Sequence, residues 1–469
     1  MSTTRPRLRR LSDGASDPVR TKPRPSHKRG TSHKRGTSRR RLVLRSLAIA
    51  FSLTAPFAYL TPGCGARSDL DQTDHVDAGA DASVDSAPDA TSDAPSDAPV
   101  DVPMDVPVDV PNDVPDASCP DLDGDGYTTC DNDCDDTNPL VNPGAFDFPN
   151  GANDDCAGGI DDPNVDCDSA LDYGSQDPLD YAFAIDLCQI TSDGATGKNK
   201  IWGVIDAELR LANGTGAPAA EQHAIITSFG NTLGPRKNQS FIVLSTGRAA
   251  TPTQPYFTPE TPQTGTDTAT SSPAPQGFPT NKSGCPVPPP VAFNPVNLRI
   301  RARVPTNAQS FGFDHSFFSA EYPEYACSGF NDMWVALLKT GASGIANNHN
   351  IIFDAQGTPG SVNLNFFDRC VAGQTGCFGT PGFNFCSGGI GELLGTGYGE
   401  QDPSAPCGAP TSIGGGTGWI TTDAPMIPGE TITLELMVWD SSDGVWDSSA
   451  IVDNFHWLQG SLPNPHTFR

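Results

Sequence analysis

Apolar and polar residues alternate along two segments in the second half of the chain. In the first segment the apolar positions are Val296, Leu298, Ile300, Ala302 and Val304, and the intervening residues are asparagine and arginine. The second segment repeats the pattern at Ile432, Leu434, Leu436 and Val438. A period of two is typical of a β-strand with one buried face. Both segments are therefore predicted to be strands.

Shorter apolar runs predict further strands across the same region. We expect them at residues 200–211, 224–229, 240–245, 334–338, 350–353 and 362–366. Glycine-rich loops separate these runs, no long amphipathic helix is present, and the Pro- and Thr-rich residues 251–290 are expected to form a long loop. Residues 168–469 are therefore predicted to be a mainly β domain, a two-sheet sandwich or jelly roll.

The N-terminal region has the order of an export signal. Residues 42–60 are the only long apolar stretch, but Arg45 and Pro56 interrupt it, so it is short for a membrane-spanning helix of about 20 residues. The basic run SRRR precedes it and TPGC follows at residues 61–64. Basic, apolar and then small residues form a signal segment, which we assign to residues 1–63.

Cys64 ends this segment, and Gly63 with Cys64 resembles a bacterial lipobox. The resemblance implies an exported lipoprotein attached through Cys64 to the outer membrane or cell surface. Leu60 lies four residues before the cysteine rather than three, and Pro62 is unusual, so cleavage without lipidation and an uncleaved anchor remain alternatives.

The chain before this signal is unusually long and basic. Residues 1–37 contain the repeat SHKRGT, at Ser26 and Ser32. A nucleic-acid-binding arm is one interpretation, and a translation start assigned too far upstream is the one we favour. The SRRRL sequence at residues 38–42 also weakly resembles a twin-arginine export signal.

Aspartate recurs at every fourth position from Asp77 to Asp113, with Ala, Ser, Pro and Val between. In a helix this spacing would stack like charges, and the prolines would break the helix. Residues 64–118 are therefore predicted to be a disordered stalk, able to extend by about 170 Å at ~3.1 Å per residue. Weak calcium binding by the aspartates is the alternative.

Charge is distributed very unevenly. Residues 1–63 hold 15 of the 29 Lys and Arg residues; without them 14 basic and 54 acidic residues remain, a net charge of −40. Such a protein repels nucleic acid and anionic membranes, whereas divalent cations are natural partners.

Residues 119–167 form an acidic, cysteine-rich module. Asp121, Asp123 and Asp125 alternate, Gly126 follows, and the Tyr127 carbonyl comes next, as at the start of an EF-hand-type loop. Position 12 is Asn132 instead of a bidentate glutamate, so other acids must close the loop. The predicted calcium ligands are Asp121, Asp123, Asp125, Tyr127, Asp131, Asp133, Asp135 and Asp136.

The module resembles the MopE-type metal-binding motif of bacterial surface proteins. The matching segments are residues 121–127, 133–139, 143–145 and 150–158. Asn153 and Ala157 depart from the family pattern, which weakens a second acidic cluster around Asp154 and Asp155 as a metal site. The resemblance implies metal binding, sometimes described as copper, but oxygen ligands without histidine favour calcium.

Two other interpretations of the module remain. The acids could form a solvated face, or Cys119, Cys130, Cys134 and Cys156 could bind zinc. In an exported protein disulfides are expected instead, which leaves Cys64 as the odd cysteine. The cysteines available for six bridges are Cys119, Cys130, Cys134, Cys156, Cys167, Cys188, Cys285, Cys327, Cys370, Cys377, Cys386 and Cys407.

Residues 310–338 and 438–457 are the most distinctive parts of the β domain. They contain SFGFDHSFFSAEYPEYACSGFNDMWVALL and VWDSSDGVWDSSAIVDNFHW, and both resemble the choice-of-anchor L domain of bacterial surface proteins. The resemblance covers most of residues 168–458. It implies an extracellular β domain and no established activity.

Acidic and amide residues are concentrated in these two segments: Asp314, Glu321, Asn331, Asp332, Asp440, Asp443, Asp447 and Asp453. They could form a calcium site or a groove lined by Tyr322, Tyr325, Trp439 and Trp446. The interpretation we favour is that the acids fix turns and the aromatic residues fill the core.

No sequence motif of GxSxG, HExxH or P-loop type is present, so we expect no enzyme activity. The leading hypothesis is a calcium-binding surface lipoprotein whose β domain binds a ligand, matrix or protein partner. A carbohydrate-binding protein is the alternative. A surface hydrolase using an acid pair such as Glu321 and Asp332 is a third hypothesis.

Overall fold

The computed structural model describes residues 119–162, 166–249, 268–400, 407–408 and 413–469. All of them belong to one compact unit, Val106–Arg469. The predicted signal segment, Cys64 and the stalk lie outside the described residues, as does much of the loop predicted at residues 251–290. Within the described ranges, no helix has the length and apolar character needed to cross a bilayer.

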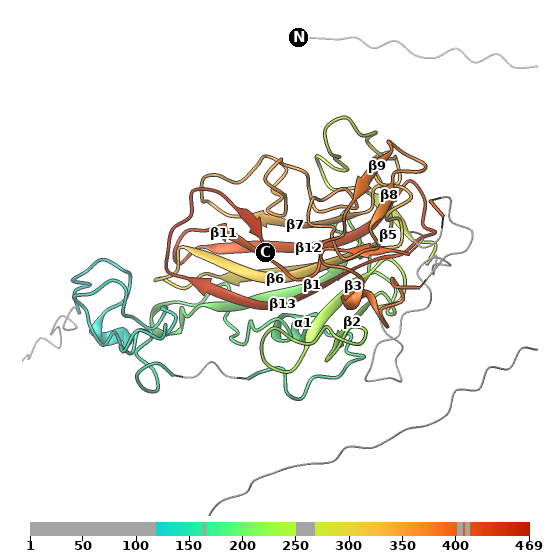
Figure 1. The fold of residues 1–469 in the computed structure, drawn as a ribbon. Helices are drawn as coiled ribbons and strands as arrows, with labels where there is room; N and C mark the ends of the chain where they lie inside the picture. The colour runs from blue at the N-terminus through green and yellow to red at the C-terminus, as the bar shows by residue number, and fades with distance from the viewer. Residues whose placement is uncertain (1–118, 163–165, 250–267, 401–406, 409–412) are drawn as a thin grey trace, which may run out of the picture. The chain divides into compact units, whose positions relative to one another are not determined.

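Two antiparallel sheets dominate the fold (Figure 1). The first has the order β1-β5-β12-β7, with β4 also paired to β5; its strands are β1 (Gly203–Arg210), β4 (Ser271–Pro273), β5 (Val291–Arg303), β7 (Met333–Lys339) and β12 (Thr431–Ser441). The second has the order β14-β11-β6-β13-β3-β2, with β10 paired to β6. Its strands are β2 (His223–Ile226), β3 (Phe241–Ser245), β6 (Ser310–Ser319), β10 (Gly415–Gly416), β11 (Ile420–Pro425), β13 (Ser448–Leu458) and β14 (His466–Phe468).

The remaining described elements are short. A separate hairpin pairs β8 (Gly373–Thr375) with β9 (Gly382–Asn384). The α-helix α1 (Pro178–Phe183) begins after Asp177, whose carboxylate accepts a hydrogen bond from the Leu179 amide. Three 3-10 helices are found at Thr129–Asp131, Gly197–Asn199 and Gly391–Leu393.

Alternation of residue type explains the central strands. On β5, Leu298 and Ile300 are buried between the sheets, whereas Arg299 and Arg301 face outward and pair with Asp206 on β1. On β12, Leu434 and Leu436 lie opposite Ile300 and Leu298. The period-two prediction for both segments is therefore confirmed.

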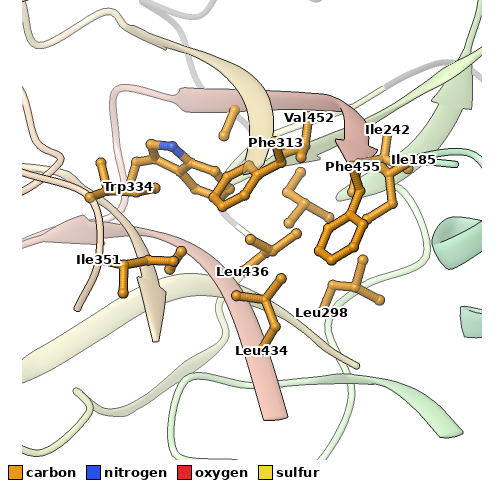
Figure 2. Close-up of a cluster of buried hydrophobic side chains, with 14 of the residues drawn as sticks. Ile185, Ile242, Leu298, Phe313, Trp334, Ile351, Leu434, Leu436, Val452 and Phe455 are labelled. Carbon is orange, nitrogen blue, oxygen red and sulfur yellow. The ribbon is translucent and has the colours of Figure 1, made fainter. Parts of the chain in front are cut away.

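The main core lies between the two sheets. Figure 2 shows Leu298, Leu434 and Leu436 from the first sheet facing Phe313 and Val452 from the second. Burial of these side chains from both sheets makes the domain a sandwich, as predicted, and supplies most of its stabilisation through the hydrophobic effect.

Two strand predictions are wrong. Residues 350–353 form only isolated bridges, because the chain turns back through a loop around Asp354. Residues 362–366 form successive turns, in which Leu364 donates to the Ser361 carbonyl and Phe367 to that of Leu364. Ile351, Ile352, Val362 and Leu364 are nevertheless buried, so the apolar runs indicated burial and not strand structure.

Twelve cysteines form six disulfides. Two lie within the acidic module, Cys119–Cys130 and Cys134–Cys156. The other four are Cys167–Cys188, Cys285–Cys327, Cys370–Cys386 and Cys377–Cys407. The four module cysteines are consequently unavailable as zinc ligands, and the zinc interpretation is wrong.

Candidate metal centre

The aspartate loop at the start of the acidic module is closed by its own side chains. The two oxygens of Asp121 accept hydrogen bonds from the amides of Gly124, at 2.6 Å, and Gly126, at 3.0 Å. Both glycines have positive φ angles, 83° and 93°. A side chain would strain this backbone, so glycine at these positions permits the tight turn that gathers alternating aspartates.

Five of the predicted ligands converge on one another. One group consists of Asp121, Asp123 and Asp136, and a second of Asp123, Asp125 and Asp133. Within each group one carboxylate oxygen per residue lies within 4.8 Å of the others. Asp123 belongs to both groups and therefore sits at the centre of the cluster.

Two oxygens at this centre have no hydrogen-bond partner among the described atoms. They are Oδ2 of Asp123 and Oδ2 of Asp133, and both are buried. A buried carboxylate oxygen without a partner is costly, and a cation between the two groups would satisfy both. The residues present thus fit a metal ion held by carboxylate oxygens.

The electrostatics of the cluster agree with this geometry. Burial raises the pKa of Asp125 to about 6, and the neighbouring carboxylates of Asp123 and Asp133 raise it further. Burial likewise raises the pKa of Asp133, and Asp123 contributes again. The carboxylates therefore repel one another when no positive charge lies among them.

Two other predicted ligands, Asp131 and Asp135, lie outside these groups. Oδ2 of Asp131 accepts a hydrogen bond from the Thr128 hydroxyl, and Oδ1 of Asp135 accepts one from Thr137. Neither residue belongs to a convergent group among the described residues. The predicted ligand at Tyr127 is its backbone carbonyl, which stays a prediction; the ring of Tyr127 is buried, and its hydroxyl donates to the Lys200 carbonyl outside the module.

Sequence reasoning did not single out Asn142, which connects the centre to the β domain. Its Nδ2 donates to Oδ2 of Asp125 at 2.7 Å, and its Oδ1 accepts from the Thr306 hydroxyl at 2.7 Å and the Gly144 amide at 2.9 Å. Asn142 is fully buried. The only available signal was an asparagine preceding the Pro-Gly turn of the motif.

Further contacts fix the module to the β domain. The Asn307 side chain accepts from the Phe146 amide and donates to the carbonyls of Leu140 and Phe146. The Phe146 ring packs edge-on against Trp202 at 5.3 Å. The convergent carboxylates and the sandwich are therefore joined by a continuous set of contacts.

The second acidic cluster is organised differently. Oδ2 of Asp154 accepts from the Phe148 amide and the Asn150 side chain, and both oxygens of Asp147 accept backbone amides, from Asp154 and Asp162. In the described part of the chain, this cluster contains no group of convergent ligand atoms. These acids stabilise turns.

Five of the acids singled out in the β domain fall into two sets. Asp314 and Asp453 face each other across β6 and β13; Asp314 pairs with Arg236, and Asp453 accepts from the Arg236 amide. Glu321, Asp332 and Asp440 form a separate buried set. Because Glu321 and Asp332 are both buried, they do not form an accessible acid pair of the glycosidase type.

The aromatic residues and His315 of the β domain are mostly structural. Trp439 is fully buried and Tyr322 is 4% exposed, so neither forms an open groove. His315 accepts from the Trp334 indole through Nδ1, at 3.0 Å, which leaves Nε2 to donate to the Thr422 hydroxyl. Its burial lowers its pKa to about 3.

The fold and the candidate site together define a disulfide-bonded β-sandwich protein with an acidic module whose carboxylates fit a metal ion. The choice-of-anchor L domain model matches residues 219–454, half of the chain, and the chain belongs to this family. A second model, described as "Putative metal-binding motif" and of the MopE type, matches residues 133–162. Both resemblances are confirmed, and together they fit a non-enzymatic protein of the cell surface.

No curated protein and no solved structure is significantly similar to the chain. The family match to residues 133–162 includes Asp133 and Asp136 but begins after Asp121, Asp123 and Asp125. The convergence of these residues with the matched segment is therefore shown by the structure and not by the family match.

Proposed function

We propose that the protein is an exported, non-enzymatic surface protein whose acidic module binds calcium and whose β-sandwich presents a ligand-binding surface. The observation that carries the calcium proposal is the pair of buried, partnerless oxygens on Asp123 and Asp133 within the convergent groups. Calcium takes six to eight oxygen ligands at about 2.3–2.6 Å, and closely spaced carboxylates provide them.

Other metals fit these ligands less well. Zinc and copper favour sulfur and imidazole ligands, whereas residues 119–162 contain no histidine and their four cysteines are in disulfides. Magnesium is usually bound through one or two carboxylates and retains several waters, whereas five carboxylates converge here.

Calcium in this position would order the module on the sandwich. Asn142 contacts both Asp125 and Thr306, so fixing the Asp125 carboxylate also fixes this hydrogen-bonded connection. The proposed role of the ion is to make the module a rigid spacer at the base of the β domain. Cys64 and the Asp-rich stalk would attach that spacer to the outer membrane or cell surface.

Thermal melts and calorimetry on the full chain test the calcium proposal. Removing calcium with EDTA should lower the melting transition of the module, and Asp123→Asn should weaken calcium binding about tenfold or more by removing a shared ligand charge. Asp135→Asn is the matched control, because it makes the same chemical change outside the convergent groups. The proposal would be refuted if EDTA left the melting transition unchanged. It would also be refuted if wild type, Asp123→Asn and Asp135→Asn bound calcium with equal affinity.

The lipid anchor has its own test. Cys64→Ser should release the protein from the membrane fraction if the cysteine carries the lipid. Membrane retention of this variant would refute the lipid anchor but would leave the calcium proposal intact.

A second candidate function is saccharide binding. A cavity of about 700 Å³ is lined by Asn365, Asn384 and Phe383, among other residues. Phe383 and its neighbour Phe385 are 62% and 82% exposed. Exposed rings beside amides are suited to the apolar and hydroxyl faces of a sugar.

A glycan array tests this function directly. Phe383→Ala, which removes an exposed ring lining the cavity, should abolish any hit, whereas Phe468→Ala, which removes an exposed ring on β14, should not. Absence of hits would remove the support for a saccharide ligand and leave a protein or matrix partner as the proposed ligand class.

A further inference from the structure

A set of acidic residues lies where strands of both sheets end. Glu321 follows β6 by two residues, Asp332 immediately precedes β7, and Asp440 is the penultimate residue of β12. Antiparallel pairing of β6 with β13 and of β7 with β12 brings these strand ends together. Topology thus brings Asp440 to two acids that lie more than 100 residues earlier in the sequence.

Asp332 connects the two sheets directly. Its Oδ1 accepts a hydrogen bond from the Ser441 amide at 3.0 Å, and its Oδ2 accepts one from the Ser448 hydroxyl at 2.7 Å. Ser441 ends β12 in the first sheet, and Ser448 begins β13 in the second. Asp332 is fully buried at this junction.

Two neighbouring carboxylates contain a buried oxygen without a partner. Glu321 is 4% exposed and its Oε2 has no hydrogen-bond partner; Asp440 is 1% exposed and its Oδ1 has none. The other Asp440 oxygen accepts from Nδ2 of Asn294 at 3.1 Å. No ion pair between described residues involves Glu321, Asp332 or Asp440.

These groups require a neutralising partner. Burial raises the pKa of Glu321 and of Asp440 well above the usual range, and the Asp332 carboxylate raises both further. Protons would neutralise the charges, but a protonated carboxyl group donates and needs an acceptor, which the two partnerless oxygens lack. A calcium ion, about 2.3–2.6 Å from each ligand, can join carboxylates that do not contact one another.

We propose that Glu321, Asp332 and Asp440 hold a divalent cation of the calcium type inside the β-sandwich, separate from the centre in the acidic module. Asp332 and Asp440 are held by hydrogen bonds, whereas no described group hydrogen-bonds the Glu321 carboxylate. Their oxygens are not gathered within 4.8 Å as in the module. The ion therefore draws the Glu321 side chain toward Asp332 and Asp440, and it ties the ends of the two sheets together.

Counting bound calcium on the full chain tests this second site. Equilibrium dialysis of wild type and Glu321→Gln should show one calcium fewer per chain in the variant. Asp123→Asn should lose only the calcium of the module. The double variant Asp123→Asn and Glu321→Gln should lose the calcium of the module and the calcium of the sandwich. Glu208→Gln is the matched control, because Glu208 lies on β1 with its side chain 43% exposed. If Asp123→Asn loses no calcium but Glu321→Gln loses one, the module proposal fails and the sandwich proposal stands. If only Asp123→Asn loses calcium, the sandwich proposal fails and the module proposal stands.

Hydrogen exchange locates the ion in the unmutated protein. Calcium should slow exchange in residues 438–449 at least tenfold relative to EDTA, since these residues include the Ser441 amide bound to Asp332. If Glu321→Gln fails to fold, Asp440→Asn and this wild-type measurement replace it. Full calcium retention by a folded variant, or unchanged exchange in residues 438–449, would overturn the proposal.

Discussion

The acidic module and the β-sandwich bury different kinds of side chain. Within residues 119–162 the buried apolar residues are Tyr127 and Ala145, whereas Asp133, Asp136, Asn142 and Asp154 are buried polar residues. The sandwich core instead contains a large apolar cluster from both sheets, including Trp334, Leu436 and Phe311. The two regions of one chain therefore depend on different sources of stability.

This difference follows from size and composition. A segment of about 40 residues buries too little apolar surface to fold on that basis alone, and it needs disulfides or a metal ion. The module has two disulfides and five convergent carboxylates, whereas the sandwich can rely on the hydrophobic effect. Changes to packing should therefore affect the sandwich, and changes to covalent or ionic links should affect the module.

The largest expected effect is on the sandwich core. Leu436→Ala removes a fully buried side chain and should lower the free energy of unfolding of the sandwich by about 2–5 kcal/mol. The matched control is Leu140→Ala in the module, where the side chain is 52% exposed and a change below about 1 kcal/mol is expected. Denaturant unfolding measures both, and equal losses would contradict the proposed difference.

Removing a module disulfide should give the next largest effect. The double variant Cys134→Ser and Cys156→Ser opens a loop with a sequence separation of 22 and should destabilise the module by about 3 kcal/mol. The calcium concentration for half-saturation should rise while the sandwich transition is unchanged. Cys370 and Cys386 lie in the sandwich core. The double variant Cys370→Ser and Cys386→Ser should therefore destabilise the sandwich and leave the calcium concentration for half-saturation of the module unchanged.

Acid should destabilise the sandwich through its buried histidines. Burial lowers the pKa of His223 to about 4, so the folded chain keeps this residue neutral while the unfolded chain takes up a proton below about pH 6.5. Between pH 7 and pH 5 this difference should cost about 2 kcal/mol of stability. His223→Asn should remove that part of the pH dependence, and His466→Asn, at an exposed position, should not.

The comparison must be made between variant and wild type, because other groups titrate in the opposite sense. Burial raises the pKa of Asp453 to about 8, so its contribution to stability is greatest at low pH and is lost as the pH rises through that value. Identical pH profiles for His223→Asn and wild type would show that His223 does not control acid sensitivity.

The smallest expected effect concerns the contact between the two regions. Tyr127→Phe removes the hydrogen bond from the module to the Lys200 carbonyl and should cost about 1 kcal/mol. Faster hydrogen exchange within residues 119–162, without a change in the sandwich, is the expected readout. Tyr173→Phe, at a residue 38% exposed, is the control, and equal exchange in both variants would argue against this contact.

The sequence by itself determined the local patterns of this protein. Alternating apolar residues gave β5 and β12, because a period of two is a property of each strand. The Asp-x-Asp-Gly-Asp-Gly sequence likewise specified a tight acidic loop, since neighbouring residues and glycine set its geometry. The apolar runs at residues 350–353 and 362–366 were misleading, because burial alone does not distinguish a strand from packed turns.

Only the tertiary structure decided which acids meet. Asp131 and Asp135 resemble Asp133 and Asp136 in sequence, yet the fold directs their side chains to Thr128 and Thr137. Asn142 reaches Thr306, and Asp332 reaches Ser441 and Ser448, across more than 100 residues of chain. Contacts over such separations depend on strand order and register, which local sequence patterns do not encode.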